Sequence, residues 1–486
     1  MNQATTLLAL LALAAMITLA CLPPVYAATW HFDNVLGTSM TIQIDGIDDH
    51  QGESAVAAVL EEIARLEAVL STYQSDSEIS RLNSARTSDA TSPELYAVIQ
   101  GCKRWQVVSD NHFSCKLGKI INAWREAEAV QSAPDRINLR RIARAVRRAN
   151  ITLEHTQAPY STTLPEQVWL NVDGLAKGYV IDEVFTMLQG QVENARAIKL
   201  DIGGDGRYWT AENEQAWQVD ISAGGGAEAS GRIPILAGAV AASGHHDRGI
   251  EIGRQFYSHI IQPRDGWPKH NAPSSVVVAP NAMTADAIAT TLANMSATQG
   301  IDWVNKLRGV EAIVSLPNGI KLASDNWAGQ ALGSKSPILQ LAYEIPAFET
   351  GRYRRPYLAI WITDGKRTTV RNLLLLGESQ RWARENSRWW RQVGRRDESV
   401  LTGLARPTKR PGQYQVSWDG LDDQGVPVAD RQLTLHIEAS REHGEHDYAT
   451  FELDLANPNP ISAESNGEIG ALSLSWATEA VNTAKR

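Results

Sequence analysis

Asp286 and Thr290 are the two residues of this sequence whose types and spacing best suit a metal ion. They lie four residues apart in a stretch predicted to be helical, so their side chains share one helix face near its N-terminal end. A carboxylate combined with neutral oxygen atoms is the donor set that a hard cation such as Mg²⁺ prefers. An aspartate in the first turn of a helix is more often stabilised by the helix dipole than bound to a metal, so the pair alone favours a structural role.

A second candidate segment covers residues 171–182, where a predicted strand ends, Gly174 turns the chain and a helix begins. The N-terminus of a helix presents free backbone N–H groups and the positive end of the dipole, which suits a phosphate. Lys177 adds a positive charge at the same place. The alternative is an ordinary strand–helix joint with a surface lysine.

Three more segments contain residues that could contact a ligand. Gly203-Gly204 follow a predicted strand, and paired glycines either let a ligand approach the backbone or simply form a turn. The loop 71–83 carries Tyr73, which could stack on a planar ring, beside Ser, Asp and Glu side chains that could hold a ribose. That loop is equally typical of a polar connection with a helix cap. His259, in the stretch 257–268, is by itself compatible with a structural role.

The composition places these residues in a globular protein of more than one domain. The chain has 486 residues, with 43% hydrophobic and 21% charged residues, which are values typical of a folded protein. Its formal net charge of −9 argues against nucleic-acid binding, which normally needs a basic surface.

The first 27 residues resemble an export signal. Residues 7–20 form an uncharged apolar run that is shorter than a membrane span, and Val25-Tyr26-Ala27 supplies the small residues that signal peptidase recognises. We therefore expect a soluble, periplasmic mature protein, with lipid attachment at Cys21 as the alternative. After cleavage only Cys102 and Cys115 remain. An oxidising compartment allows a disulfide between them, but the sequence does not establish one.

The elements that must position the candidate residues mix helices and strands without strict alternation, which predicts an α+β domain. Apolar residues recur at three- and four-residue steps over residues 56–70, and further helices are predicted over 93–108, 136–148, 176–188 and 284–295. The helix at 136–148 carries many arginines, which form either a solvated face or a docking patch for an acidic partner. Predicted strands cover 40–44, 169–172, 197–202, 217–221, 239–242 and 275–279.

After about residue 334 the pattern changes to short strands separated by turn residues, which favours a β-sandwich. The predicted strands are 357–362, 413–418, 433–438, 449–455 and 469–476. Trp382, Trp389 and Trp390 belong either to the core or to a partner surface.

The order and spacing of these segments resemble the ApbE family of flavin transferases (FAD:protein FMN transferases) from about Val35 to Gly333. The segments that carry the resemblance are Gly37-Thr38, the loop 71–83, Ala176-Lys177-Gly178-Tyr179 with Asp182, Gly203-Gly204-Asp205, Ser243-Gly244, residues 259–268 and the helix with Ala285-Asp286-Ala287 and Thr290. The resemblance implies an α+β fold related to the T-fold class, with FAD and a divalent ion between two halves.

The resemblance also implies roles for individual residues. Asp286, Thr290 and the backbone carbonyl of Ala176 match the ligands of Mg²⁺. His259, Asp286 and Lys177 match the catalytic residues, with His259 beside the reacting phosphate. The FAD-binding residues implied are Thr38, Tyr73, Ser77, Glu78, Asp173, Lys177, Asp182, Gly204, Ser243 and His259.

In the implied reaction, a Thr or Ser hydroxyl of an exported or membrane-bound redox protein attacks the FMN-side phosphorus of FAD, and AMP leaves. The sequence departs from the family pattern at Gln262, where an aspartate is usual, and at Asp265, where a threonine is usual. Two alternatives are therefore kept: a pyrophosphatase that splits FAD into FMN and AMP, and a catalytically weak flavin-binding or scaffold protein.

The C-terminal part resembles an uncharacterised family that is often fused to, or encoded beside, ApbE proteins. The resemblance rests on Arg355-Pro356-Tyr357, Trp418-Asp419-Gly420 and Glu438-Ala439-Ser440-Arg441. The expected organisation is a signal peptide (1–27), a flavin transferase domain (30–335), an immunoglobulin-like sandwich (340–478) that could dock a partner, and a flexible tail (479–486). A run resembling the acceptor sequence of flavin transferases has Ala405 where the modified threonine would fall, so self-modification is not expected.

Overall fold

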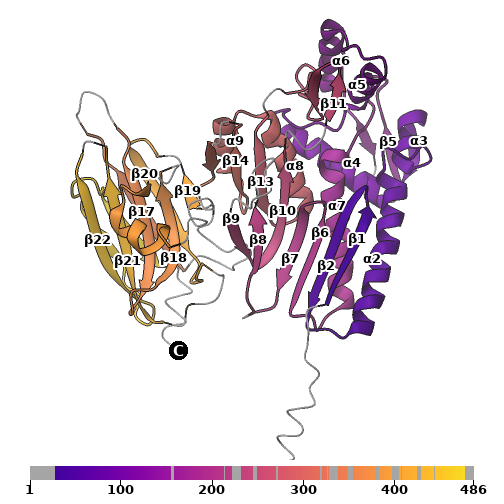
Figure 1. Cartoon of the computed structure of the whole chain (residues 1–486). Coiled ribbons are helices and arrows are strands. Elements are labelled where there is room, and N and C mark those ends of the chain that lie inside the picture. The colour runs from indigo at the N-terminus through magenta and orange to yellow at the C-terminus, as the bar shows by residue number, and fades with distance from the viewer. Residues whose placement is uncertain are drawn as a thin grey trace, which may run out of the picture.

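The computed structural model in Figure 1 describes two sheet-containing units joined in one chain. The described residues are 28–476, except 155–157, 213, 222–230, 245–248, 270–271, 318–319, 326, 328–337, 349–353, 378–382, 397–403, 407, 424–427, 429 and 443. The predicted signal peptide and the predicted tail therefore lie outside the described residues. No helix in the described ranges is long and apolar enough to cross a membrane.

The N-terminal unit is built on an eight-stranded sheet in the order β1-β2-β6-β7-β10-β13-β14-β15. Every neighbouring pair in this sheet is antiparallel. The strands are β1 (Ala28–Val35), β2 (Thr38–Asp45), β6 (Ala197–Ile202), β7 (Asp205–Thr210), β10 (Ala237–Ser243), β13 (Ser274–Ala279), β14 (Glu311–Ser315) and β15 (Lys321–Ala323). The sheet therefore joins segments from both ends of the domain.

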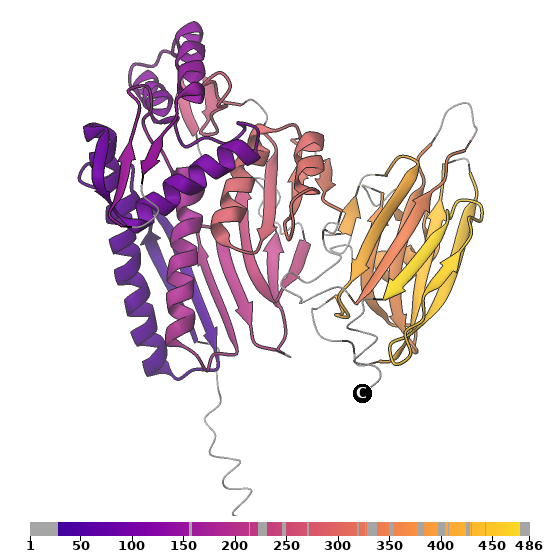
Figure 2. The same cartoon turned by 180° about the vertical axis from the view of Figure 1, so that it is seen from behind.

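Helices cover one face of this sheet, as Figure 2 shows. They are α2 (Asp49–Leu70), α4 (Pro93–Val108), α7 (Asp173–Gln191), α8 (Ala282–Asn294) and α9 (Ala297–Val304). The predicted helices over 56–70 and 93–108 are confirmed, and each begins at a side-chain cap: Asp48 accepts from the Gln51 N–H and Ser92 accepts from the Leu95 N–H. Their apolar stripes join the largest hydrophobic core of the molecule.

The opposite face of the sheet is covered by a hairpin of β8 (Trp217–Ile221) and β9 (Gly231–Ile235). Tyr208, Val276 and Trp327 pack with the hairpin in a second apolar cluster. Because both faces are covered, β13 is buried over nearly its whole length, which explains its uninterrupted valine run.

A smaller substructure, which we call the cap, lies at one end of the sheet. It consists of α5 (Gly118–Ala129), α6 (Arg136–Arg148) and the hairpin of β11 (Gly249–Ile252) and β12 (Gln255–Ser258). Trp124 of α5 packs against Tyr257 and Trp267 and donates from its indole N–H to the Gly266 carbonyl at 2.9 Å. This aromatic cluster fixes the segment after β12 to the cap. Beside it lie α3 (Glu78–Ala85) and a small sheet of β3 (Thr87–Thr91), β4 (Thr152–Glu154) and β5 (Tyr160–Thr163).

The predicted strand at 169–172 does not form. Its only backbone bridge joins Trp169 to Leu117, and its other edge is occupied by the side chain of Asn83 instead of a strand. The sequence pattern is that of a strand, but the fold offers no continuous ladder partner at this place.

The C-terminal unit is the predicted β-sandwich. One sheet has the order β20-β16-β24-β23 and the other β19-β18-β17-β21-β22, and their inner faces share one apolar core. The strands are β16 (Leu339–Ile345), β17 (Tyr357–Asp364), β18 (Thr369–Leu376), β19 (Ala405–Arg406), β20 (Gly412–Trp418), β21 (Gln432–Ser440), β22 (His446–Asp454), β23 (Ile461–Ala463) and β24 (Leu472–Trp476).

Two features of the sandwich refine the sequence analysis. The last strand begins at Leu472 instead of 469, because Asn466 and Ile469 pair with each other in a turn. Trp389 belongs to the core, since it is fully buried and its indole N–H donates to Asn372. Trp382 lies outside the described residues.

Candidate functional site

Asp286 lies where α7 and α8 cross, and its carboxylate faces the first turns of α7. The side chain is buried, and its Oδ2 accepts a hydrogen bond from the Gly178 N–H at 3.2 Å. A Cβ atom at position 178 would lie 2.4 Å from the Ala282 carbonyl oxygen. Only glycine therefore allows the two helices to approach this closely, which brings a carboxylate from residue 286 to the helix that begins at residue 173.

Lys177 and Asp205 form an ion pair beside Asp286. The Lys177 Nζ lies 2.7 Å from Asp205 Oδ2, and Asp205 Oδ1 accepts from the Ala242 N–H at 3.0 Å. Asp205 is buried at the start of β7, directly after the paired glycines. Lys177 is therefore held over the sheet by a carboxylate from the glycine turn.

The charge in this cluster is unbalanced toward the negative. Burial, reinforced by the negative charge of Asp205, raises the pKa of the Asp286 carboxyl to about 7, while Lys177 opposes this shift. Asp173 adds a third negative charge to the field at Asp286. Three carboxylates around one ammonium group give a site whose electrostatics favour a further cation.

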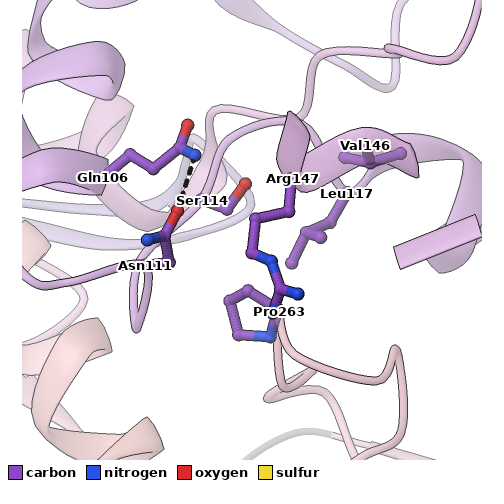
Figure 3. Close-up of a pocket in the computed structure, with 7 residues that line it drawn as sticks. All are labelled: Gln106, Asn111, Ser114, Leu117, Val146, Arg147 and Pro263. Atoms are coloured by element: carbon purple, nitrogen blue, oxygen red, sulfur yellow. Dashed lines mark hydrogen bonds between the residues drawn. The ribbon is translucent and has the colours of Figure 1, made fainter. Parts of the chain in front are cut away.

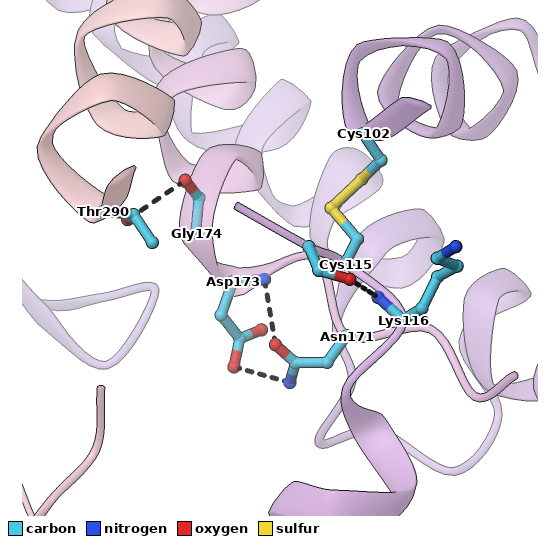
Figure 4. The surroundings of a disulfide bond; sticks show 8 residues. Cys102, Cys115, Lys116, Asn171, Asp173, Gly174 and Thr290 are labelled. Carbon is cyan, nitrogen blue, oxygen red and sulfur yellow. Dashed lines mark hydrogen bonds between the residues drawn. A yellow bond between two sulfur atoms is a disulfide. The ribbon is translucent and has the colours of Figure 1, made fainter. Parts of the chain in front are cut away.

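The two helices that meet at Asp286 also carry neutral oxygens. Thr290 follows it by one helical turn on α8, and its hydroxyl donates to the Gly174 carbonyl at 3.4 Å, as Figure 4 shows. Ala176 lies on the facing first turn of α7. Among the described residues there is no group of three or more His, Cys, Asp or Glu side chains that could hold a metal. One carboxylate with a hydroxyl and a backbone carbonyl is still a donor set that fits Mg²⁺.

Asp173 connects the start of α7 to the exposed Tyr73. Its Oδ1 accepts from the Thr72 hydroxyl and its Oδ2 accepts from the Tyr73 hydroxyl, both at 3.1 Å. Tyr73 is 73% exposed, and the Arg125 guanidinium of the cap lies 5.1 Å from its ring centre. An exposed aromatic ring that is held at its hydroxyl end offers a face on which a planar ligand could stack.

The paired glycines form the turn between β6 and β7 that the sequence suggests. Gly203 and Gly204 have φ angles of +60° and +84°, and the Gly204 N–H donates to Asp201 Oδ1 at 3.2 Å. A Cβ atom at 203 would collide with Thr38, whereas nothing lies within 4 Å of one at 204. Thr38 and Gly204 therefore lie together at one end of the sheet, and Gly204 faces open space.

Ser77, Glu78 and Asp182 use their polar atoms within the protein framework. Ser77 caps α3, and Glu78 accepts from the Ser92 N–H at the start of α4 at 2.8 Å. The two carboxylate oxygens of Asp182 accept from the N–H groups of Ala282 and Met283, at 2.8 and 2.9 Å, and Asp182 also pairs with Arg207. These residues align the helices of the site.

His259 and Ser243 lie at the ends of strands. His259 is exposed and follows β12 in the cap, and Ser243 ends β10 opposite Ser275 of β13. Gln262 and Asp265 belong to the turn after His259: the Gly266 N–H donates to the Gln262 carbonyl, and Asp265 Oδ1 accepts from the Trp267 N–H at 3.1 Å.

The structure gives contacts to three residues that lie in the candidate segments but to which the sequence analysis assigned no role. Asp205 pairs with Lys177, Thr72 binds Asp173, and Asn171 donates to Asp173 Oδ2 at 3.0 Å. The signal for Asp205 was its position directly after the glycine pair. Nothing in the local sequence distinguishes Thr72 or Asn171 from other polar loop residues.

A small crevice lies on the cap side of this region, and Figure 3 shows the side chains around it. It is too small to admit even a water molecule, so it does not accommodate a dinucleotide. Its lining residues are Gln106, Asn111, Ser114, Leu117, Val146, Arg147 and Pro263.

The fold and the side-chain geometry together define a class of protein: an α+β N-terminal domain with an acidic, glycine-bounded cluster where α7 meets α8, followed by a β-sandwich. Residues 36–314 match the model of the ApbE family, which is more than half of the chain, and the chain therefore belongs to the ApbE family. Residues 339–471 match a second family, described as predicted periplasmic protein (DUF2271).

Relatives of known activity match the N-terminal part. A FAD:protein FMN transferase of Vibrio cholerae is 30% identical over 308 residues, covering 60% of this chain and 89% of the relative. One from Haemophilus influenzae is 26% identical over 284 residues, covering 56% of this chain and 80% of the relative.

Solved structures support the fold of the same region. The ApbE protein of Thermotoga maritima superposes with a TM-score of 0.55 at 22% identity, covering 62% of this chain and 97% of that one. The apo form of the Pseudomonas stutzeri flavinyl transferase ApbE has a TM-score of 0.51 at 17% identity, with the same coverage. The α+β fold expected from the family resemblance is confirmed.

Proposed function

We propose that this chain is a FAD:protein FMN transferase that acts on exported or membrane-bound redox proteins. The observation that carries the proposal is the family membership: relatives named for this activity align over most of their length, and the residues that match the ApbE family, 36–314, include the whole acidic cluster. The Asp286–Lys177–Asp205 cluster and the exposed Tyr73 supply the charges and the aromatic surface that such a substrate needs.

FAD would bind across the end of the sheet at which these residues lie. Tyr73 offers its ring to the isoalloxazine, and the open space beside the Gly204 Cα lets the pyrophosphate approach the turn. The N-terminal turns of α7 and the Lys177 ammonium group favour the negative charge of the phosphates. Thr38, Asp173, Ser243 and His259 complete the proposed FAD site. Ser77, Glu78 and Asp182 contribute by holding the helices that carry it.

Asp286, Thr290 and the Ala176 carbonyl would hold Mg²⁺. The raised pKa of Asp286 supports this assignment, because a buried carboxylate among other negative groups is stabilised by a cation. When bound, the ion would neutralise charge that develops on the pyrophosphate oxygens.

In the proposed reaction the hydroxyl oxygen of a Thr or Ser on the acceptor forms a bond to the FMN-side phosphorus. The bond from that phosphorus to the bridging oxygen breaks, and AMP leaves with the electron pair. His259, exposed at the edge of the cap, would take the hydroxyl proton. Lys177 orients the phosphates, since positioning and electrostatics dominate catalysis of phosphoryl transfer.

The proposal includes export to the periplasm. The N-terminal segment resembles a signal peptide, and the C-terminal domain matches a family described as periplasmic. The sandwich would then dock the redox partner in that compartment.

The deciding experiment combines the purified mature protein, FAD and Mg²⁺ with an acceptor bearing an Asp-x-x-Thr-Gly-Ala-Thr sequence. We expect a fluorescent acceptor band after denaturing electrophoresis, and a loss of about a hundredfold or more in rate for Asp286→Ala. Asp302→Ala, at an exposed position on α9, is the matched control and should retain full activity.

Release of AMP is measured in the same samples. AMP without labelled acceptor would identify a FAD pyrophosphatase, and bound FAD without AMP would identify a flavin-binding protein. Either result contradicts the proposed transfer, and unchanged transfer by Asp286→Ala contradicts the assigned metal ligand.

A further inference from the structure

The structure contains one disulfide in its described part, and it joins α4 to the segment before α5. The Sγ atoms of Cys102 and Cys115 are bonded across 13 residues of sequence, and both residues are buried. Figure 4 places this bond close to Asn171 and Asp173. The proposed transfer reaction uses neither cysteine, so the position of the bond calls for its own explanation.

Residues 115–118 lie beside residues 169–171, the segment that leads into α7. The Asn171 N–H donates to the Cys115 carbonyl at 2.8 Å, and the Gly118 N–H donates to the Trp169 carbonyl at 2.9 Å. These two bonds replace the strand ladder that is missing on this side of the chain.

Asn83 closes the other side of the same segment. Its side chain is buried and makes two hydrogen bonds with Leu170: Nδ2 donates to the carbonyl at 2.9 Å, and Oδ1 accepts from the N–H at 2.7 Å. The backbone before α7 is thus held between a side chain on α3 and a segment tethered by the disulfide.

Asn171 connects the segment held by the disulfide to the proposed flavin site. Its Nδ2 donates to Asp173 Oδ2 at 3.0 Å and lies 3.4 Å from the Thr72 hydroxyl oxygen, while its Oδ1 lies 3.4 Å from the Asp173 N–H nitrogen. Asp173 in turn accepts from the hydroxyl groups of Thr72 and Tyr73. A continuous series of hydrogen bonds therefore runs from the Cys115 carbonyl to the exposed ring of Tyr73.

The tethered segment reaches the α7–α8 contact as well. A Cβ atom at Gly174 would lie 3.1 Å from the Phe113 ring and 3.3 Å from the Thr290 hydroxyl oxygen. Movement of residues 113–118 would disturb the start of α7 at two points, Asn171 and Gly174.

We propose that Asn171 is a positioning residue for the Tyr73–Asp173 edge of the flavin site, and that the Cys102–Cys115 disulfide holds Asn171 in place. FAD affinity then depends on an intact disulfide, which confines full activity to an oxidising compartment. This inference rests on the proposed function, because it assigns flavin binding to Tyr73 and Asp173.

The test measures the equilibrium dissociation constant of FAD, together with transfer, for the double variant Cys102→Ala/Cys115→Ala. We expect an increase of about tenfold in the dissociation constant and in the KM for FAD, with kcat at saturating FAD changed far less. Asn171→Ala should have the same effect. Combining the three substitutions should add little beyond either change alone, because both act through one contact.

A matched control separates positioning from a general loss of structure. The control is Lys116→Met, which alters the residue next to Cys115. The Lys116 ammonium group donates to the Ala149 carbonyl at 2.8 Å on the α6 side, away from Asn171. The substitution should lower the midpoint of thermal unfolding while leaving FAD affinity within about twofold. Far-ultraviolet circular dichroism checks that each variant is folded.

Three outcomes would overturn the inference: wild-type FAD affinity in the folded cysteine-free variant, wild-type FAD affinity in Asn171→Ala, or fully additive effects of the cysteine and Asn171 changes. A double variant that fails to fold leaves the decision to Asn171→Ala, which overturns the inference if its FAD affinity is unchanged. Wild-type protein that binds no FAD would refute the proposed function itself, and the inference with it.

Discussion

At the scale of single residues, the site depends on buried charges that are paired by distant parts of the chain. Asp205 is 2% exposed, and it is held by the Lys177 ammonium group and the Ala242 N–H. Removing one member of such a pair leaves a buried charge without compensation, which costs more than the pair contributes. Lys177 therefore has a structural role in addition to its proposed contact with phosphate.

We predict that Lys177→Met lowers the free energy of unfolding by about 1–3 kcal/mol, because Asp205 Oδ2 loses its charged partner. Adding Asp205→Asn should recover part of that stability, since the amide still accepts from Ala242, but it should not restore FAD affinity. Urea denaturation and FAD titration of the single and double variants measure the two effects separately. Equal stability of wild type and Lys177→Met would contradict the ion pair.

At the scale of elements, the crossing of α7 and α8 brings the proposed metal ligands together. Ala176 lies on one helix, and Asp286 and Thr290 lie on the other. Asp182 fixes the geometry by accepting from the first N–H groups of α8 from the third turn of α7, and Gly178 allows close contact of the backbones. The spacing of the two helices, and with it the separation of the proposed ligands, therefore depends on the Asp182 carboxylate and on the absence of a side chain at Gly178.

Gly178→Ala should disrupt this crossing although alanine favours a helix. The added Cβ would lie 2.4 Å from the Ala282 carbonyl oxygen, so we expect a loss of about 1–3 kcal/mol in unfolding free energy and a marked loss of transfer.

Gly190→Ala, near the end of the same helix, is the control. Nothing lies within 4 Å of a Cβ there, so this change should be neutral or stabilise by up to about 1 kcal/mol. Thermal unfolding of both variants and transfer assays compare them. If Gly178→Ala is as active and as stable as the wild type, close contact of α7 and α8 at this position is not required, and the prediction is wrong.

At the scale of the whole molecule, the two units have separate cores and should respond differently to pH. His436 is buried in the sandwich, stacked on Trp361 at 4.8 Å and hydrogen-bonded through its ring nitrogens to Thr363 and Tyr448. Burial lowers the pKa of His436 from its usual 6.5 to about 4. The folded sandwich therefore holds this histidine in its neutral form.

The sandwich should lose stability as the pH falls. Between pH 6.5 and 4 the unfolded chain binds a proton at His436 that the folded sandwich does not, so the unfolding free energy decreases with decreasing pH, by up to about 3 kcal/mol from this residue. Differential scanning calorimetry at pH 7 and pH 4.5 measures the unfolding transition of this domain. In His436→Gln the decrease in unfolding free energy between pH 7 and pH 4.5 should be smaller by up to about 3 kcal/mol. An identical decrease in the variant would show that other groups cause it.

Much of the fold could be predicted because its causes are local. The apolar periodicity and the caps Asp48 and Ser92 define α2 and α4 within a few contiguous residues, and the valine run defines β13. The failure at 169–172 has the opposite cause. Its apolar pattern is that of a strand, but the partner that decides the matter is Asn83, a side chain 87 residues from Leu170.

The order of the segments in the sequence was sufficient to predict the family and the α+β fold, and the spacing of short strands predicted the C-terminal sandwich. The metal ligands stay a prediction. The tertiary structure alone decided how the polar atoms are used: Asp182 caps α8, Asp205 pairs with Lys177, and Cys115 supports Asn171. The physical reason is the range of each interaction. Helix periodicity, caps and turns act over a few residues and are written in the local sequence, whereas hydrogen bonds and ion pairs depend on which distant atoms the packed chain brings within about 3 Å.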